Sequence, residues 1–197
     1  ASVAEHCPSE FIRYQIVDVT DEKHVKLAVE ETIAHWGGID VCIPNAGLGI
    51  FEPLKTAELG DWKKMVDVNI GGVLNTLHAC LPSLIENKGH VIQIGSIAAR
   101  NVFPNSGIYC ATKHAVLAIS ESLRIEFRDE LAVTTINPGA VETSFIDQTK
   151  DDELRENYRA QFEQGMQPGC IAEAIAFAVS YGGKGEFSEM TMRHDRR

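Results

Sequence analysis

The sequence lacks several features that mark specialised classes of protein. Among its 197 residues, no apolar run approaches the roughly 18 or more that a membrane-spanning helix requires, and no signal-peptide pattern is visible. Positive charge is scarce, because 18 lysines and arginines stand against 28 aspartates and glutamates. The resulting net charge of −10 argues against non-specific binding to nucleic acid. We therefore expect a cytoplasmic protein that binds neither membranes nor nucleic acid.

Paired cysteines are also missing. No two of the five cysteines have the Cys-x-x-Cys spacing of a zinc or redox site; they are Cys7, Cys42, Cys80, Cys110 and Cys170. Their odd number and mainly apolar surroundings predict buried thiols in a reducing compartment. Cys110 and His114 are four residues apart on a predicted helix, but no third ligand has motif spacing, so we expect no metal site.

What the sequence does have is an alternation of apolar segments of strand length with longer segments of helical periodicity. A composition of 44% hydrophobic and 23% charged residues is ordinary for a globular protein with an ample core. The expected strands are residues 12–17, 39–43, 90–94, 132–136 and 187–192. The expected helices are residues 21–36, 59–85, 108–128 and 171–181, and Thr20 or Asp21 can cap the first. This pattern predicts a single α/β domain, residues 1–197, with a parallel sheet covered on both faces.

Three of the predicted strands end in distinctive turns. They are Asn45-Ala46-Gly47, Gly95-Ser96 and Asn137-Pro138-Gly139. Each turn alone is ordinary, since glycine, proline and asparagine end strands in many proteins. In a parallel α/β sheet, however, ligands bind outside the carboxyl ends of the strands. The three turns together therefore predict a binding site.

The residues expected to transfer a proton at this edge of the sheet are Ser96, Tyr109 and Lys113. Tyr109 and Lys113 are four residues apart, so one face of the predicted helix should carry both. A free tyrosine has a pKa of about 10, and an ammonium group within a few ångströms should lower it. A serine hydroxyl at the end of the preceding strand could then hydrogen-bond a substrate oxygen. A Tyr-x-x-x-Lys pair alone is common on solvated helices, but with Ser96 it predicts an acid/base site for a C–OH or C=O centre.

The order and spacing of the motifs resemble those of the short-chain dehydrogenases/reductases over nearly the whole chain. The motifs are Asp18-Val19, Pro44-Asn45-Ala46-Gly47, Asn69, Ser96, Tyr109-x-x-x-Lys113 and PGAVET at 138–143. The resemblance implies a Rossmann-like, doubly wound parallel sheet. It also implies an NAD(P)-dependent oxidoreductase that interconverts a carbonyl compound and a secondary alcohol.

The resemblance also implies a task for each matching residue. Tyr109 would be the acid/base, Lys113 would lower its pKa and hold the nicotinamide ribose, and Ser96 would steady the substrate. Asn69 would hold a water that links Lys113 to solvent, although without the resemblance it would be interpreted as an amide making local hydrogen bonds. Further cofactor contacts would come from Asp18, Val19, Asn45, Ala46 and Gly47 on the adenosine side, and from Pro138, Gly139, Val141 and Thr143 at the nicotinamide.

The polar segment 142–167 is similar in position to the family's substrate lid. Its Phe145, Tyr158 and Phe162, with Val102 and Phe103, are the candidates for lining a pocket, which indicates an apolar-bodied substrate. The ending FSEMTMR resembles a subgroup of NADP-dependent 3-hydroxy-acid and alcohol dehydrogenases, which favours NADP over NAD. The long helices carry apolar residues on several sides, consistent with the homodimers and homotetramers of this family.

Two departures from the family pattern stand out. Pro44 replaces the first asparagine of the usual turn, which removes one amide donor and fixes φ. No glycine pair has the spacing or context of a phosphate-binding loop, so the family's first β-α-β unit is missing from this sequence. Without that unit, the strands expected at 12–17 and 39–43 should have unpaired edges. We therefore expect the natural polypeptide to contain residues that this sequence omits.

Two other functions remain open from the sequence. A catalytically silent binding or scaffold protein of the same fold is favoured by the missing phosphate loop and opposed by the complete set of Ser96, Tyr109 and Lys113. A hydrolase using Ser96 and Lys113 lacks the nucleophile-elbow pattern. Binding of a nicotinamide cofactor separates the enzyme from the scaffold.

Overall fold

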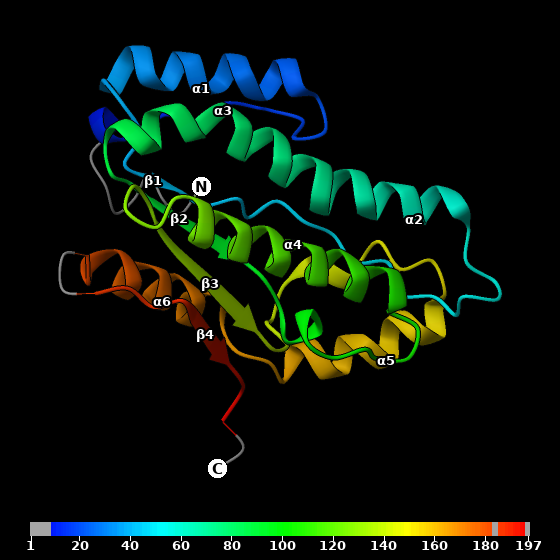
Figure 1. Cartoon of the computed structure of the whole chain (residues 1–197). Helices are drawn as coiled ribbons and strands as arrows, with labels where there is room; N and C mark the ends of the chain where they lie inside the picture. The colour runs from blue at the N-terminus through cyan, green and yellow to red at the C-terminus, as the bar shows by residue number, and fades with distance from the viewer. Residues whose placement is uncertain (1–8, 183–184, 196–197) are drawn as a thin grey trace.

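A computed structural model describes residues 9–182 and 185–195. Its centre, within those residues, is a parallel sheet in the order β1-β2-β3-β4, which is also the order along the chain (Figure 1). The strands are β1 (Val41–Cys42), β2 (His90–Ile94), β3 (Ala132–Pro138) and β4 (Glu189–Met192). The register places Ile94 beside Ile136 and Pro138 beside Met192. The carboxyl ends therefore meet along one edge, called the carboxyl rim below.

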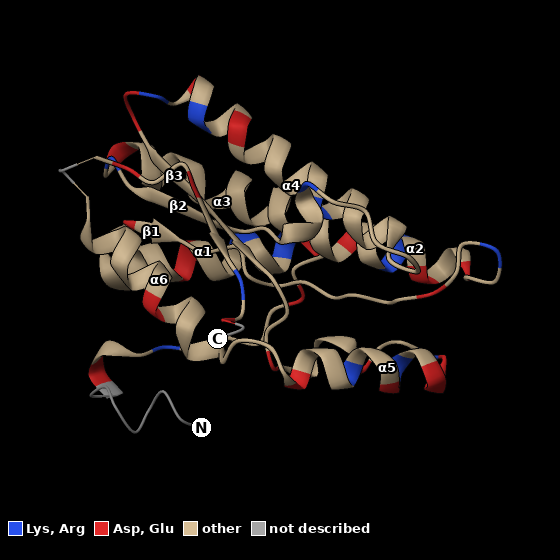
Figure 2. Ribbon diagram, turned by 90° about the horizontal axis from the view of Figure 1, so that it is seen from below, with Lys and Arg blue, Asp and Glu red and all other residues tan. Residues whose placement is uncertain are grey.

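Helices cover both faces of this sheet. On one face lie α3 (Gly72–Glu86) and α4 (Gly107–Glu126), and on the other lies α6 (Pro168–Ser180) (Figure 1). Helix α1 (Glu22–Trp36) packs on α3, and α2 (Leu59–Val66) precedes α3 in the chain. Figure 2 shows charges of both signs along α5 (Asp152–Glu163), which is typical of a surface helix. The predicted α/β fold class is confirmed.

The alternation of side chains along the strands divides the core into two layers. Val91 of β2 and Val133 of β3 pack in the layer with α3 and α4, whereas Ile92 and Ile136 pack in the layer with α6. All four side chains are fully buried. Burial on both faces explains why the strands are continuous apolar runs, and each such side chain contributes about 1.5–3 kcal/mol.

Local chemistry sets the bounds of α1. The Asp21 carboxylate accepts hydrogen bonds from the N–H groups of Lys23 and His24, which caps the first turn. Gly37 follows the helix with φ +87°, in the left-handed region that glycine enters without strain. The predicted helix is confirmed, with Asp21 as its cap.

The helix expected over 59–85 is continuous but not regular. A π-helical segment, η3 (Asp67–Gly71), joins α2 to α3, and such segments often occur at functional sites. Pro82 lies inside α3, which continues to Glu86. By length and composition alone, the helix over 59–86 could cross a membrane, with a mean hydropathy of 1.3 in its most apolar window. Of that window 39% is buried inside the structure, where Val73, Leu77 and Leu84 of α3 join the core.

Residues 12–17 do not form the strand that the sequence predicts. They pair with no strand in the described part of the chain, and Tyr14 and Ile16 are 90% and 98% exposed. The outer edge of β1 also has no strand beside it among those residues. A strand needs a neighbour for its backbone N–H and C=O groups, so an apolar pattern alone is insufficient.

The cysteines divide into two groups. Cys42, Cys80 and Cys110 are buried free thiols, as predicted, and a hydrogen bond with Cys80 raises the pKa of Cys42. The expectation of burial is wrong for Cys170, which is exposed in the first turn of α6. Cys7 lies outside the described residues.

Candidate active site

Strand β2 and helix α4 bring Ser96, Tyr109 and Lys113 together at the carboxyl rim. Ser96 follows β2 and caps the short 3-10 helix η4 (Ile97–Ala99), where its Oγ accepts a hydrogen bond from the N–H of Ala98 at 3.1 Å. Tyr109 and Lys113 lie one turn apart on α4. The hydroxyls of Ser96 and Tyr109 are within hydrogen-bond reach. The structure thus brings these three residues together, as the sequence predicts.

Lys113 is the buried cation of this group. Only 8% of the residue is exposed, and its Nζ donates a hydrogen bond to the main-chain oxygen of Ile94 at 2.8 Å. Burial lowers the pKa of Lys113 from 10.5 to about 8, because a cation loses hydration inside the protein. Lys113 is therefore mostly charged at neutral pH and loses that charge at mildly alkaline pH.

The pKa of Tyr109 differs from the sequence expectation. Desolvation raises it from 10.0 to about 12, and the hydrogen bond with Ser96 opposes this shift only in part. The net shift is upward, opposite to the expected lowering, because desolvation outweighs the effect that lowers the pKa; the Lys113 ammonium lies 6.0 Å from the ring centre. Tyr109 therefore carries its proton at neutral pH, as a free tyrosine does, and the raised pKa makes it a weaker acid.

Asn69 lies in the π-helical segment η3 and is fully buried. Its Oδ1 accepts a hydrogen bond from the N–H of Leu48 at 2.8 Å. Its Nδ2 donates to the Leu48 carbonyl at 2.9 Å and to Thr112 Oγ1 at 3.0 Å. Asn69 therefore ties the turn after β1 to α4, next to Lys113. Its role as a water ligand stays a prediction.

A cavity of about 620 Å³ opens at the carboxyl rim. Ser96, Tyr109 and Lys113 line it. So do most of the expected cofactor residues, namely Asn45, Gly47, Pro138, Gly139, Val141 and Thr143. The residues expected at the nicotinamide end therefore gather around one space.

Three expected cofactor residues do not line this cavity: Asp18, Val19 and Ala46. Val19 packs closely on Gly72, where an added Cβ would lie 2.7 Å from the valine side chain. The Asp18 carboxylate accepts hydrogen bonds from the N–H and the hydroxyl of Thr20, at 2.9 and 2.8 Å. Asp18 thus has the local role of a turn residue here, and its contact with an adenine ring stays a prediction.

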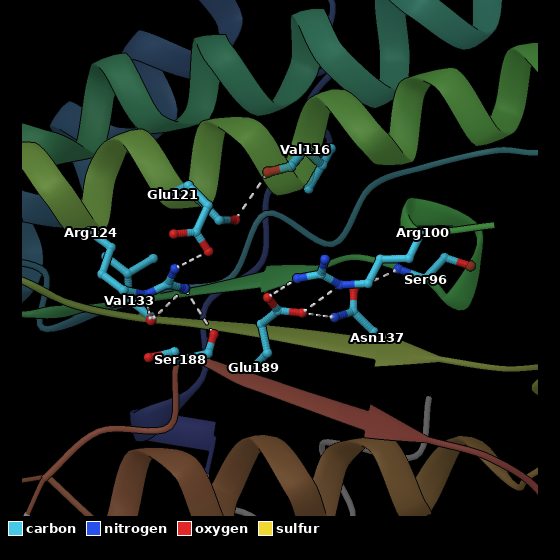
Figure 3. Close-up of polar contacts among 10 residues, drawn as sticks. Ser96, Arg100, Val116, Glu121, Arg124, Val133, Asn137, Ser188 and Glu189 are labelled. Atoms are coloured by element: carbon cyan, nitrogen blue, oxygen red, sulfur yellow. Dashed lines mark hydrogen bonds and ion pairs between the residues drawn. The ribbon is translucent and has the colours of Figure 1, made fainter.

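Asn137 belongs to one of the three turns expected at the site, but no role was predicted for its side chain. It is 2% exposed on β3, and its Oδ1 accepts a hydrogen bond from the main-chain N–H of Ser96 at 3.2 Å (Figure 3). Its Nδ2 donates to Glu189 of β4 at 3.1 Å, and Glu189 forms an ion pair with Arg100, directly after η4. These contacts hold η4 against β3 and β4. The signal in the sequence, an amide before Pro138, is too common at strand ends to indicate this role.

The polar segment 142–167 lies beside the cavity. It contains the 3-10 helix η5 (Ser144–Ile146) and α5, and Phe145, Tyr158 and Phe162 line the cavity as predicted. Phe103 also lines it, whereas Val102 is exposed and does not.

Comparisons with known proteins agree with this geometry. The sequence profile of the short chain dehydrogenases matches residues 1–154. The chain belongs to the short-chain dehydrogenase family. An uncharacterized oxidoreductase of Staphylococcus saprophyticus is 36% identical over 180 residues, which are 89% of this chain and 73% of that protein. The chain is accordingly an NAD(P)-dependent oxidoreductase.

Two solved structures of dehydrogenases are similar to this short-chain dehydrogenase. An alcohol dehydrogenase from Thermococcus sibiricus, complexed with 5-hydroxy-NADP, has a TM-score of 0.81 and 28% identity, covering 93% of this chain and 75% of that one. A closed form of serine dehydrogenase, complexed with NADP+, has a TM-score of 0.83 and 29% identity, covering 90% of this chain and 73% of that one.

The cavity of this short-chain dehydrogenase fits the nicotinamide end of such a cofactor. The Lys113 ammonium and the Tyr109 hydroxyl offer hydrogen-bond donors suited to sugar hydroxyls. A Cβ added at Gly47 would lie 3.3 Å from Asn69 Oδ1 and 3.9 Å from Lys113 Nζ, so glycine keeps the approach to Lys113 open. The 197 residues contain no glycine-rich loop for the phosphates. The lining residues therefore suit the nicotinamide and its ribose.

Proposed function

We propose that this short-chain dehydrogenase interconverts a carbonyl compound and a secondary alcohol, with NADP(H) as hydride carrier and Tyr109 as acid/base. The convergence of Ser96, Tyr109 and Lys113 on one cavity supports this most directly. The NADP+ and 5-hydroxy-NADP complexes of the similar dehydrogenases support NADP, with NAD as the alternative.

The protein's contribution is proton transfer and orientation. A bound nicotinamide cofactor would supply the hydride. Ser96 Oγ donates a hydrogen bond to the substrate oxygen, and Tyr109 gives that oxygen its phenolic proton as the C=O bond is reduced to C–OH. The ammonium of Lys113 then stabilises the tyrosinate that remains. Such proton donation by a positioned side chain contributes about 10²- to 10⁴-fold in rate.

At neutral pH the resting site holds the proton that carbonyl reduction consumes. A phenol with a pKa of about 12 carries its proton at neutral pH, which the reduction consumes. The reverse reaction needs the tyrosinate, which is a minor species under those conditions.

Two measurements test this function. Titration of NADPH with the full-length protein, followed by nicotinamide fluorescence, reports cofactor binding. Loss of NADPH absorbance with a panel of ketones and aldehydes reports turnover. Binding with turnover is the expected result. Failure of NADPH and NADH to bind would support the silent scaffold protein, which the missing phosphate loop favours.

We propose a cytoplasmic location and a homodimer or homotetramer. The buried free thiols of Cys42, Cys80 and Cys110 fit a reducing compartment. Leu74 of α3 and Ile125 of α4 are exposed apolar side chains that a second copy could cover. Sedimentation of the full-length protein should give a dimer or tetramer, and a monomer at working concentration would contradict the oligomer.

A further inference from the structure

The cavity beside Tyr109 is walled by aromatic rings, and Phe51 is their centre. Phe51 is 4% exposed, and its ring centre lies 5.8 Å from that of Tyr109 in an edge-to-face arrangement. The ring centre of Tyr158 lies 4.7 Å from it, and those of Phe145 and Phe162 lie 6.3 and 6.4 Å from it. Rings at these distances and tilts form a cohesive apolar surface.

Neighbouring contacts hold these rings in place. Phe145 packs directly on Gly49, where an added Cβ would lie 2.4 Å from the phenyl ring. The Tyr158 hydroxyl donates a hydrogen bond to the main-chain oxygen of Pro104 at 3.0 Å, which connects the lid segment to the loop after η4. Phe145 and Phe162 are stacked, with an interplanar angle of 18°. The aromatic rings along the cavity are therefore held in place before a substrate binds.

The cavity offers an anionic substrate no free cation among the described residues that line it. Among the described residues that line it, Lys113 is the one charged side chain, and its Nζ already binds the Ile94 carbonyl. Arg159 of the lid segment lies 3.4 Å from both Asp147 and Glu156. A carboxylate placed among these rings would lose its hydration without gaining a dedicated cation.

We infer that the substrate is an uncharged carbonyl compound bearing an aromatic or alicyclic ring close to the reacting carbon, and is not a hydroxy acid or oxo acid. The inference rests on the proposed function and narrows its substrate class. The ring packs edge-on against Phe51 and Phe145, which directs the carbonyl oxygen toward Tyr109 and Ser96. It departs from the 3-hydroxy-acid subgroup that the C-terminal sequence resembles, because the one cation among the described lining residues, Lys113, already binds the Ile94 carbonyl.

Three related ketones test separately how a negative charge and a phenyl ring on the substrate affect its reduction. Methyl 4-oxo-4-phenylbutanoate is a neutral aryl ketone, its free acid adds only the charge, and methyl 4-oxopentanoate replaces only the phenyl ring by methyl. With the full-length protein and NADPH, kcat/KM for the phenyl ester should exceed that of each other compound by about 10- to 100-fold. NADPH binding is measured separately by fluorescence.

A designed variant tests whether the lack of a free cation in the cavity causes the preference for the neutral ester over the free acid. Gln161 of α5 lines the cavity, so Gln161→Arg should raise kcat/KM for the free acid by about 10-fold relative to the ester. Gln161→Met, of similar length and without charge, is the matched control and should not raise turnover of the acid. Phe145→Leu should reduce the preference for phenyl over methyl, because it removes one ring of the wall.

The outcomes are distinguishable. Reduction of the free acid or of the methyl ketone as efficiently as the phenyl ester overturns the inference and leaves the oxidoreductase function in place. Bound NADPH with no reduction of any of the three ketones also overturns the substrate class. Failure of NADPH to bind overturns the proposed function itself.

Discussion

The main-chain N–H of Ser96 donates a hydrogen bond to Oδ1 of Asn137, 3.2 Å away on the neighbouring strand (Figure 3). Asn137 is fixed in turn by Glu189, whose carboxylate also binds Arg100. The serine that should orient the substrate is thus held by a buried amide from β3. Asn137 is a positioning residue, because its contacts act on Ser96.

The first prediction concerns this amide. Asn137→Leu keeps the approximate volume but leaves the Ser96 N–H without its acceptor, so kcat should fall about 10-fold or more while the KM for NADPH changes little. Stability should fall by about 1–3 kcal/mol. Glu189→Gln, which can still accept from Asn137, is the control and should have a smaller effect on kcat. Steady-state kinetics that give Asn137→Leu the wild-type kcat would contradict the role.

The second prediction is a pH dependence from Lys113. Its pKa is lowered to about 8, so the stabilising positive charge is present below that pH and is lost above it. The rate of ketone reduction should therefore decline as the pH rises through about 8. Lys113→Arg keeps its charge throughout this range, so whatever activity it retains should not show this decline. An identical alkaline decline in both proteins would assign the titration to another group.

The third prediction is a gain of stability when this cation is removed. Burial lowers the pKa of Lys113 from 10.5 to about 8. The free-energy cost of burying the charged side chain therefore destabilises the folded protein fully below about pH 8. Between these two values the unfolded chain binds more protons, and the cost disappears as the pH rises. Lys113→Met should raise the melting temperature by several degrees at about pH 7, and by less at about pH 9.5. A melting temperature that falls at neutral pH would contradict this.

The fourth prediction concerns the close contact between Gly49 and Phe145. Gly49→Ala would place a Cβ 2.4 Å from the ring, so Phe145 must move and the aromatic wall must open. We expect a destabilisation of about 1–3 kcal/mol and a higher KM for the ketone. Gly60→Ala is the matched control, because a Cβ there meets nothing within 4 Å. Equal effects of the two substitutions on KM would contradict this arrangement.

The sequence was sufficient for the parts of the fold that depend on local pattern. Continuous apolar runs and caps such as Asp21 indicate β2, β3 and α1, because burial on both faces and local hydrogen bonds leave clear signatures. The segment at 12–17 has the same apolar character but no partner strand in the described residues. Pairing is a property of the whole sheet, so the segment alone could not reveal the outcome.

The candidate site also has some features that the sequence could predict and others that it could not. Ser96, Tyr109 and Lys113 could be predicted because strand ends and helical spacing fix their positions. The roles of Asn137 and Phe51 could not be predicted, because they come from contacts between distant parts of the chain. Asn137 contacts Ser96, 41 positions away, and Phe51 contacts Tyr109, 58 positions away. The direction of the Tyr109 pKa shift was also out of reach, since burial must be known before it can be weighed against a nearby charge.

The most direct test of the account is Tyr109→Phe, which removes the phenolic proton and keeps the ring. Ketone reduction and NADPH binding should be measured on the same preparation. We predict that kcat falls by about 10²- to 10⁴-fold, whereas the Kd for NADPH rises by no more than about tenfold, because one hydrogen bond to the ribose is lost and the ring still packs on Phe51. A variant that binds NADPH and retains most of its turnover would contradict the role of Tyr109 as the proton donor.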